Sequence, residues 1–223
     1  MEYHKVSADA SVARGLKYVI GETNSIACQG LAGLSDVFAS SLWSVDYGLC
    51  AASVGVSRIF WHMGTGYRYA AWQAVQNGTT APGPRPLYYG NWLLAEALGG
   101  ENKQVVSILS TSTLAGYAVY GTGKPHQRPK LQSIALVNFD VYNATATPGA
   151  ARTQVDFQIP AELSGKKVSV RRLTAASVDA RDGVTFGGQS VSLSGNIGGP
   201  KAVEKVTNGV VSVKASEAVL ISF

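Results

Sequence analysis

The apolar residues change their spacing about half-way along the chain. In the first hundred residues, two short apolar runs end in polar clusters, as buried parallel strands do. Two longer stretches repeat apolar side chains every three or four residues, which predicts amphipathic helices. In chain order, these segments are a strand over 17–22, a helix over 35–53, a strand over 57–62 and a helix over 88–98. Ser35 or Asp36 is placed to cap the first helix, and Gly55 is placed to end it.

From residue 104 onward, short β-branched runs alternate with turn residues, and no helical period remains. The runs cover residues 105–109, 117–120, 133–139, 153–159, 168–173, 191–193, 210–213 and 218–223. Such a series predicts an antiparallel β-sandwich, in which Asp182-Gly183 and Asn208-Gly209 are typical hairpin turns. We place a domain boundary near Gly99-Gly100, between domains over 1–100 and 101–223, and expect the second domain to be the stable unit.

The first hundred residues hold too few strand-helix units to close a parallel sheet. A barrel of eight units takes roughly 200 residues or more. A parallel strand with one neighbour also leaves its other edge unpaired, which folded proteins avoid. We therefore expect these units to be the end of a longer domain. A small independent α/β layer packed against the sandwich is the alternative that stays open.

The composition argues against several classes of function. A hydrophobic content of 46% is ordinary for a globular protein. The net charge of +5 comes from scattered Lys and Arg residues, a pattern typical of a solvated surface and not of a nucleic-acid interface. No run approaches the roughly 18 apolar residues of a membrane helix, and the polar start of the chain has no signal peptide. We expect neither a nucleic-acid nor a membrane partner.

Acceptor triplets, cysteines and histidines bear on compartment and cofactors. The triplets Asn77-Gly78-Thr79 and Asn143-Ala144-Thr145 fit the N-glycosylation pattern, which favours a secreted parent protein. Cys28 and Cys50 leave one disulfide or two buried thiols open, and we favour buried thiols. The three histidines are far apart and have no nearby cysteine or carboxylate pattern. We therefore expect no metal site and no cofactor.

The candidate chemistry lies at Gly21-Glu22-Thr23-Asn24-Ser25, where the first apolar strand ends. In barrel enzymes, the carboxyl ends of the strands and the loops after them build the active site. A carboxylate at this point is therefore placed to act. By itself, however, a glutamate at a strand end is more often solvated or bound within the next turn.

The order and spacing of several motifs together is more specific than any one of them. After the first motif come Ser35-Asp36-Val37-Phe38-Ala39, Leu42-Trp43, Asp46-Tyr47, Ala51-Ala52-Ser53-Val54-Gly55-Val56, His62-Met63-Gly64-Thr65-Gly66-Tyr67 and Tyr88-Tyr89-Gly90. This arrangement resembles the end of the barrel in fungal β-glucuronidases of glycoside hydrolase family 79, relatives of heparanase. The resemblance is close over residues 15–100 and looser over the sandwich.

The resemblance implies a retaining hydrolase with a (β/α)8 barrel and a C-terminal β-domain, of which this chain holds the last two strand-helix units and the sandwich. Glu22 would be the nucleophile at the end of the seventh strand, with its carboxylate facing the pocket and not bulk water. A retaining mechanism needs a second carboxyl group roughly 5–5.5 Å away. In the family, this acid follows an Asn, and no carboxylate before the sandwich does so here.

The resemblance also implies contacts to a β-glucuronide substrate. His62 would match the end of the eighth strand and face the sugar, although a satisfied buried histidine is an equal alternative. Tyr67 and Tyr69 would present hydroxyl groups, and Tyr69 is the expected partner of the uronate carboxylate. Trp72 is expected to pack its loop onto the barrel.

Three further residues follow the nucleophile in the sequence. Gln29 and Gly30 would offer backbone amides to the substrate carboxylate. Asn24 would contact the 2-hydroxyl group or support the nucleophile, although Asn after a strand is also a common turn former.

Two functions follow from these observations. In the first, the chain is the nucleophile-bearing fragment of a β-glucuronidase, inactive without a missing N-terminal barrel segment. In the second, it is a non-catalytic protein derived from such an enzyme, whose β-sandwich binds carbohydrate or packs as a structural element.

Overall fold

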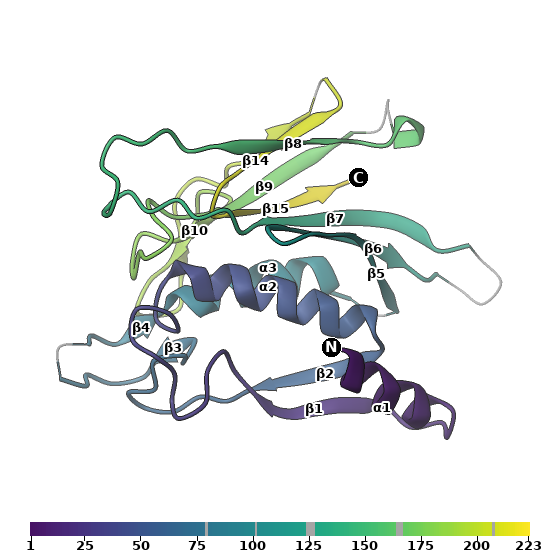
Figure 1. The fold of residues 1–223 in the computed structure, drawn as a ribbon, viewed down its shortest axis with the longest axis horizontal. Coiled ribbons are helices and arrows are strands. Elements are labelled where there is room, and N and C mark those ends of the chain that lie inside the picture. Colours follow the sequence, from purple (N-terminus) through teal and green to yellow (C-terminus); the bar gives the residue numbers. More distant parts are fainter. Residues whose placement is uncertain (79, 101, 124–127, 164–166, 207) are drawn as a thin grey trace.

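The computed structural model describes residues 1–78, 80–100, 102–123, 128–163, 167–206 and 208–223 (Figure 1). Thr79, the last residue of one acceptor triplet, lies outside these ranges. Within them, helices and mostly antiparallel strands form stacked layers.

The N-terminal half follows the predicted order of strand, helix, strand and helix. Strands β1 (Tyr18–Thr23) and β2 (Val56–Trp61) pair in parallel, and helix α2 (Phe38–Ser53) connects them. Helix α3 (Pro86–Leu98) follows the long loop. Gly55 has a φ of 91°, a conformation that glycine adopts without the clash of a Cβ atom. The four predicted elements are confirmed, and so is the predicted end of α2 at Gly55.

The predicted cap of α2 is wrong. The helix begins at Phe38, and neither Ser35 nor Asp36 caps it. Both side chains instead accept hydrogen bonds from amides of their own loop. The first helical amides donate to backbone carbonyls of the 178–180 segment. A loop of the C-terminal half therefore provides the hydrogen-bond acceptors for the first amides of this helix. The local sequence cannot predict such a contact.

A further helix, α1 (Glu2–Val12), precedes β1 and was not predicted. Its apolar side chains form no buried stripe, since Tyr3, Val6 and Val12 are exposed and Ala8 is the residue it buries. Without one apolar face, the helical period is not visible in the sequence.

The C-terminal half is antiparallel, as predicted. Its main strands are β5 (Lys103–Ser110), β6 (Leu114–Gly121), β7 (Lys130–Asn138), β9 (Ser169–Thr174), β10 (Thr185–Phe186), β13 (Glu204–Lys205) and β15 (Glu217–Ser222). Among the described residues they form one sheet in the order β10-β9-β15-β7-β6-β5, to which β13 adds by pairing with β9.

Shorter pairs flank the main sheet. They are β3 (Trp72–Gln73) with β4 (Gly83–Pro84), β8 (Gln154–Gln158) with β14 (Val210–Lys214), and β11 (Ser190–Val191) with β12 (Ile197–Gly198). A short 3-10 helix spans Ala161–Leu163. The β8–β14 pair lies over one face of the main sheet (Figure 1), and Val211 and Val213 of β14 share an apolar cluster with Ile134 and Val219. Two antiparallel sheets therefore pack face to face.

Helices α2 and α3 cover the other face of the main sheet (Figure 1). Phe38 and Leu93 of these helices belong to one buried cluster with Val137 and Leu220 of the strands. Strand β15 is buried over most of its length because it is covered on both faces. The boundary predicted near Gly99-Gly100 thus separates two kinds of secondary structure that share one core.

The two predicted hairpin turns have a different geometry. Asp182-Gly183 lies within the long connection 175–184 between β9 and β10. Asn208-Gly209 leads into β14, which pairs with β8 and not with the strand before it. Both glycines have positive φ angles, of 65° and 72°, so turns do form there. Neither is a tight hairpin between two paired strands.

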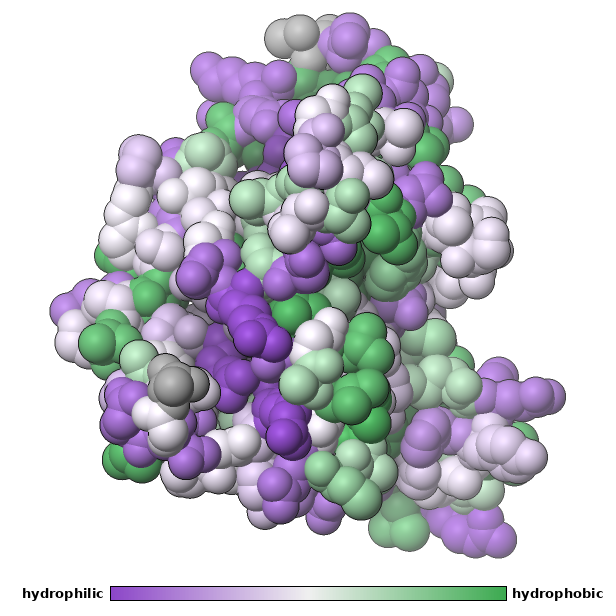
Figure 2. All heavy atoms as spheres, turned by 60° about the vertical axis from the view of Figure 1, so that its left-hand side comes forward, coloured by the Kyte–Doolittle hydropathy of each residue, from purple (hydrophilic) through white to green (hydrophobic). Residues whose placement is uncertain are grey.

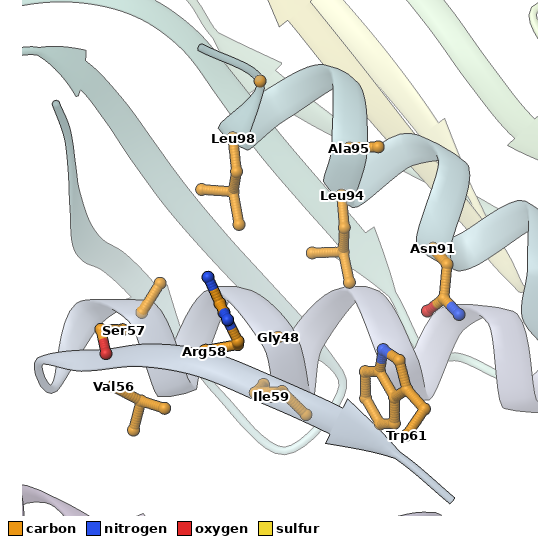
Figure 3. A pocket seen from close by; sticks show the side chains of 12 residues that line it. Gly48, Val56, Ser57, Arg58, Ile59, Trp61, Asn91, Leu94, Ala95 and Leu98 are labelled. Atoms are coloured by element: carbon orange, nitrogen blue, oxygen red, sulfur yellow. The ribbon is translucent and has the colours of Figure 1, made fainter. Parts of the chain in front are cut away.

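A groove of about 380 Å³ lies beside β2, between α2 and α3 (Figure 3). Figure 3 shows Leu94 and Leu98 of α3 pointing toward β2. In the part of the chain that the structure describes, β2 pairs with β1 alone. The buried carbonyl oxygen of the Asn91 side chain, which also lines the groove, has no hydrogen-bond partner there. Folded proteins normally cover such an edge and satisfy such an acceptor.

Candidate active site

Glu22 and His62 meet at the carboxyl ends of the two parallel strands. The Oε1 atom of Glu22 lies 3.6 Å from Nδ1 of His62, at ion-pair distance when the imidazole is protonated. The backbone amide of His62 donates to the carbonyl of Thr23 at 2.9 Å, which extends the strand pairing to this point. The structure therefore brings the predicted nucleophile and the predicted sugar contact together.

A β-bulge directs Glu22 toward His62. Ile20 pairs with Ile59 and Thr23 pairs with Trp61, so Gly21-Glu22 stands opposite the single residue Phe60. Ile20 and Thr23 both contact α2, through an apolar cluster and a hydroxyl hydrogen bond. Strict alternation would place Glu22 on the same face as Ile20. The extra residue turns it to the other face, a use of bulges that is common beside active sites.

Two tyrosines surround the imidazole of His62. The hydroxyl of Tyr69 and Nδ1 of His62 form a hydrogen bond of 2.7 Å. The ring of Tyr67 lies with its centroid 5.4 Å from that of His62 and 5.9 Å from that of Tyr69. Burial, then Tyr67 and Glu22, raise the pKa of Tyr69 above its ordinary value. A phenol is protonated at neutral pH at its ordinary pKa, and the raised pKa extends that range to higher pH.

Asn24 joins the strand ends to the following loop. Its Nδ2 donates to the backbone carbonyls of His62, at 3.0 Å, and Tyr69, at 3.3 Å. Its Oδ1 accepts from the amide of Ser25 at 2.8 Å. The side chain thus holds the loop of Tyr69 against the end of β2, and these bonds are those of a turn-forming residue.

The loop after the nucleophile carries three consecutive residues in the left-handed region. Cys28, Gln29 and Gly30 have φ angles of 59°, 69° and 86°. Left-handed backbone is unfavourable for residues with a side chain and is concentrated at functional sites. The carbonyl of Gln29 accepts from the amide of Arg68 at 2.8 Å, which fixes the loop. A Cβ atom at Gly30 would lie 2.8 Å from that of Ser35, so glycine is required there.

These elements enclose a cavity of about 370 Å³. It is lined by Glu22, Thr23, Asn24, Ile26, Ala27, Cys28, Gln29, His62 and Tyr69. Five of the residues singled out in the sequence therefore share one cavity. The two other predicted residues are not in the lining. Gly30 is buried next to the lining residue Gln29, and the tilted ring of Tyr67 lies beside that of His62. Cys28 also lines this cavity, but it was not among the predicted site residues, because a single cysteine has no spacing pattern that indicates a site.

The Glu22 side chain is 73% exposed in this chain. On the same face of the strand pair, Val19 and Phe60 are also exposed, so the described part of the chain leaves that face of β1 and β2 open to solvent. The expectation that the Glu22 carboxylate faces the pocket and not bulk water concerns the complete barrel and stays a prediction. Glu22 lines the cavity but is not enclosed by it.

Four of the other described carboxylates of the N-terminal half have partners elsewhere. Asp9 pairs with Lys5. Asp36 lies next to Arg85 and Arg181, Asp46 accepts a hydrogen bond from Tyr117, and Glu96 pairs with Arg171. The fifth, Glu2, is exposed at the start of α1. Among the residues that the structure describes, Glu22 is the one carboxylate that lines this cavity.

Both cysteines are free thiols, and Cys28 is exposed while Cys50 is partly buried. The preference for two buried thiols is therefore wrong for Cys28, because the left-handed loop turns it into the cavity. Across the described ranges, no three His, Cys, Asp or Glu side chains are grouped so that they could hold a metal ion. No helix in those ranges is long and apolar enough to span a membrane.

The remaining sequence expectations concern Trp72 and the acceptor triplets. Trp72 packs edge-on against Tyr88, with centroids 5.8 Å apart, which confirms its packing role. Asn77 is exposed, whereas Asn143 donates to Asp179 at 3.2 Å and accepts from the amide of Thr145 at 3.0 Å. Asn77 is therefore the more accessible of the two acceptors.

Comparisons with known proteins agree with this architecture. Residues 116–220 match the glycosyl hydrolase family 79 C-terminal beta domain. A β-glucuronidase of Aspergillus niger is 33% identical over 216 residues, which cover 92% of this chain and 39% of that protein. A β-glucuronidase of Neurospora crassa is 33% identical over 247 residues, covering 96% of this chain and 43% of that protein. The chain spans about two fifths of the length of these relatives.

Proposed function

This chain belongs to glycoside hydrolase family 79, and we propose that it is the portion of a retaining β-glucuronidase that carries the nucleophile, Glu22. The observation that carries the proposal is the bulge that directs Glu22 toward His62 at the carboxyl ends of two parallel strands. Barrel enzymes build their active sites at this edge.

In this mechanism the Glu22 carboxylate attacks the anomeric carbon of the glucuronide and forms a covalent glycosyl-enzyme. A second carboxyl group protonates the leaving oxygen and then takes a proton from the water that releases the sugar. Because none of the other described carboxylates of the N-terminal half lines the cavity of Glu22, we assign this acid to a further segment of the whole protein. His62 positions the nucleophile, and Tyr69 in turn fixes His62.

The same cavity offers donors for the uronate carboxylate. The Tyr69 phenol is protonated at neutral pH, and burial, then Tyr67 and Glu22, raise its pKa further. The left-handed backbone at Gln29 and Gly30 turns their amides away from the regular directions of a strand or helix. We propose that these donors bind the carboxylate of the sugar, with Asn24 holding the loop of Tyr69 in place.

We further propose that β1 and β2 are the last two strands of a (β/α)8 barrel. Their parallel pairing through α2 is the connection that such a barrel repeats. The groove beside β2, the unpartnered Asn91 oxygen and the exposed Val19 and Phe60 support a missing neighbour on each side. Its strands would be supplied by the part of the whole protein that precedes this chain in its longer relatives. Secretion of that protein is also part of the proposal, supported by the exposed acceptor Asn77.

The test is to restore the barrel. We would join the upstream portion of the A. niger β-glucuronidase to this chain and measure hydrolysis of an aryl β-glucuronide. The fusion should turn over and release the β-anomer first, whereas this chain alone should not, because one carboxylate cannot complete a double displacement. If this chain alone hydrolyses the glucuronide and Glu22→Gln abolishes that activity, the proposal that catalysis needs a further segment is contradicted. A folded but inactive fusion, with the sandwich binding sugar, would favour the non-catalytic alternative.

A further inference from the structure

Three arginines gather around one buried carboxylate where loops of the two halves meet. Nη2 of Arg181 lies 3.3 Å from Oδ2 of Asp36, and Nη2 of Arg85 lies 4.0 Å from the same atom. Arg68 lies near enough for its charge to act on Arg85. Asp182 also lines a cavity beside Arg85 and Arg181, so two carboxylates face three guanidinium groups and the surplus is one positive charge.

Arg85 is the most buried member of the cluster. Its side chain is 15% exposed, against 62% for Arg181. Burial lowers the pKa of Arg85 below its ordinary value. The positive charges of Arg181 and Arg68 also lower this pKa, whereas the negative charge of Asp36 raises it. A buried guanidinium with incomplete compensation is favourable for binding an anion, because the anion supplies the missing charge.

A cavity of about 240 Å³ opens beside Arg85 and Arg181. It is lined by Pro82, Gly83, Pro84, Arg85, Pro86, Tyr89, Arg181, Asp182, Gly183, Val184, Val191 and Leu193. The three prolines fix the backbone of one wall. Gly83 has a φ of 136°, and a Cβ atom there would lie 2.6 Å from Leu193, so a side chain would narrow the cavity.

The shape and chemistry of the lining suit a single acidic sugar unit. A guanidinium group binds a carboxylate with two parallel hydrogen bonds. Pro82 and Pro84, which are partly exposed, offer apolar surface to the face of a sugar ring. The volume is below the roughly 300–1,000 Å³ of sites for drug-sized ligands. Figure 2 shows a band of hydrophilic residues across the middle of the face that it draws.

Tyr67 connects this cavity to the candidate active site. Nη1 of Arg85 donates to the Tyr67 carbonyl at 3.3 Å, and the Tyr67 ring is tilted by 59° against that of His62. Tyr67 therefore contacts one lining residue of each cavity.

We propose that the cavity between Arg85 and Arg181 binds the carboxylate of a second uronic acid unit, so that the substrate is an acidic oligosaccharide. The choice of sugar rests on the proposed function, whereas the preference for a carboxylate rests on the arginines. Asp182 opposes the binding of an anion in this cavity and limits its affinity.

Binding is tested on this chain by ¹H–¹⁵N NMR titration with methyl β-D-glucuronide, with methyl β-D-glucoside as the neutral control. The glucuronide should shift the amides of Gly83, Arg85 and residues 181–184. Arg181→Ala should weaken this binding roughly three- to tenfold, because a charge-assisted contact is lost. Asp182→Asn should strengthen it. Arg14→Ala, which removes an exposed arginine of the turn after α1, should leave the affinity unchanged.

Several outcomes would overturn the second site. They are equal shifts with the glucoside, no shift at residues 83–85 and 181–184, or unchanged affinity in Arg181→Ala. Shifts confined to residues 22–30 and 62–69 would remove this site and leave the proposed function intact. Failure of the proposed function is detected separately, because the restored enzyme would then lack a covalently labelled Glu22.

Discussion

The hydroxyl of Tyr117 on β6 donates a hydrogen bond of 2.5 Å to Oδ1 of Asp46 on α2. The contact joins a helix of the N-terminal half to the main sheet. Burial raises the pKa of Asp46, and the hydrogen bond from Tyr117 lowers it by a smaller amount. The folded chain therefore accommodates the charged form of Asp46 less well than the unfolded chain does.

This shift predicts a dependence of stability on pH. A carboxyl group with a raised pKa lowers the free energy of unfolding as the pH rises from its ordinary value of 3.8 to its value in the folded chain. Asp46→Asn keeps an acceptor for Tyr117 but cannot ionise, so the decline over that window should be smaller. Urea unfolding of both proteins at a series of pH values measures this decline in the free energy of unfolding.

Tyr117→Phe is the matched control. It leaves the carboxylate of Asp46 half-buried without its donor and should lower the free energy of unfolding at neutral pH by about 1–3 kcal/mol. If Asp46→Asn loses as much stability at neutral pH as Tyr117→Phe, the burial of Asp46 is not the cause of its raised pKa.

The shared core predicts that α3 unfolds together with the main sheet. Leu93 is fully buried among residues of both halves, so Leu93→Ala should destabilise the chain by about 2–5 kcal/mol. Hydrogen exchange should speed up in β7 and β15 as well as in α3. Val19→Ala, at an exposed position, should change stability by less than about 0.5 kcal/mol. Unchanged exchange in β7 and β15 would show instead that residues 102–223 are stable without the helices.

Cys28 and Cys50 should differ in reactivity. Cys28 is exposed in the candidate active site, whereas Cys50 is partly buried against the main core. Iodoacetamide should therefore alkylate Cys28 in the folded chain and reach Cys50 only after denaturation. Peptide mass spectrometry reads both sites, and Cys28→Ser should remove the fast reaction. Equal labelling of both cysteines in the folded chain would show that the core does not protect Cys50 as described.

The sequence predicted those elements that have a clear apolar pattern. Helix α2 buries side chains at three- and four-residue spacing, and β1 contains a short apolar run that ends in polar residues, so both could be predicted. Helix α1 buries one alanine and left no such signal. The cap of α2 comes from the 178–180 segment, a long-range contact that local patterns do not contain.

In the candidate site, too, local features could be predicted from the sequence and long-range contacts could not. The position of Glu22 at a strand end followed from the sequence, but the bulge that turns it toward His62 depends on its pairing with β2. The pairing of Arg85 and Arg181 with Asp36 was equally unreadable, because these residues lie far apart in the chain. The expectation that the Glu22 carboxylate faces the pocket concerns the complete barrel, and in this chain the side chain is 73% exposed.

Covalent labelling of Glu22 tests the central claim most directly. The fusion that restores the barrel is treated with 2-fluoro-glucuronyl fluoride, and labelled peptides are mapped by mass spectrometry. We predict a single label on Glu22, retention of anomeric configuration, and a loss of turnover by orders of magnitude in Glu22→Gln without loss of folding. A label on Asp36, Asp46 or any other carboxylate, or a product of inverted configuration, would contradict the account.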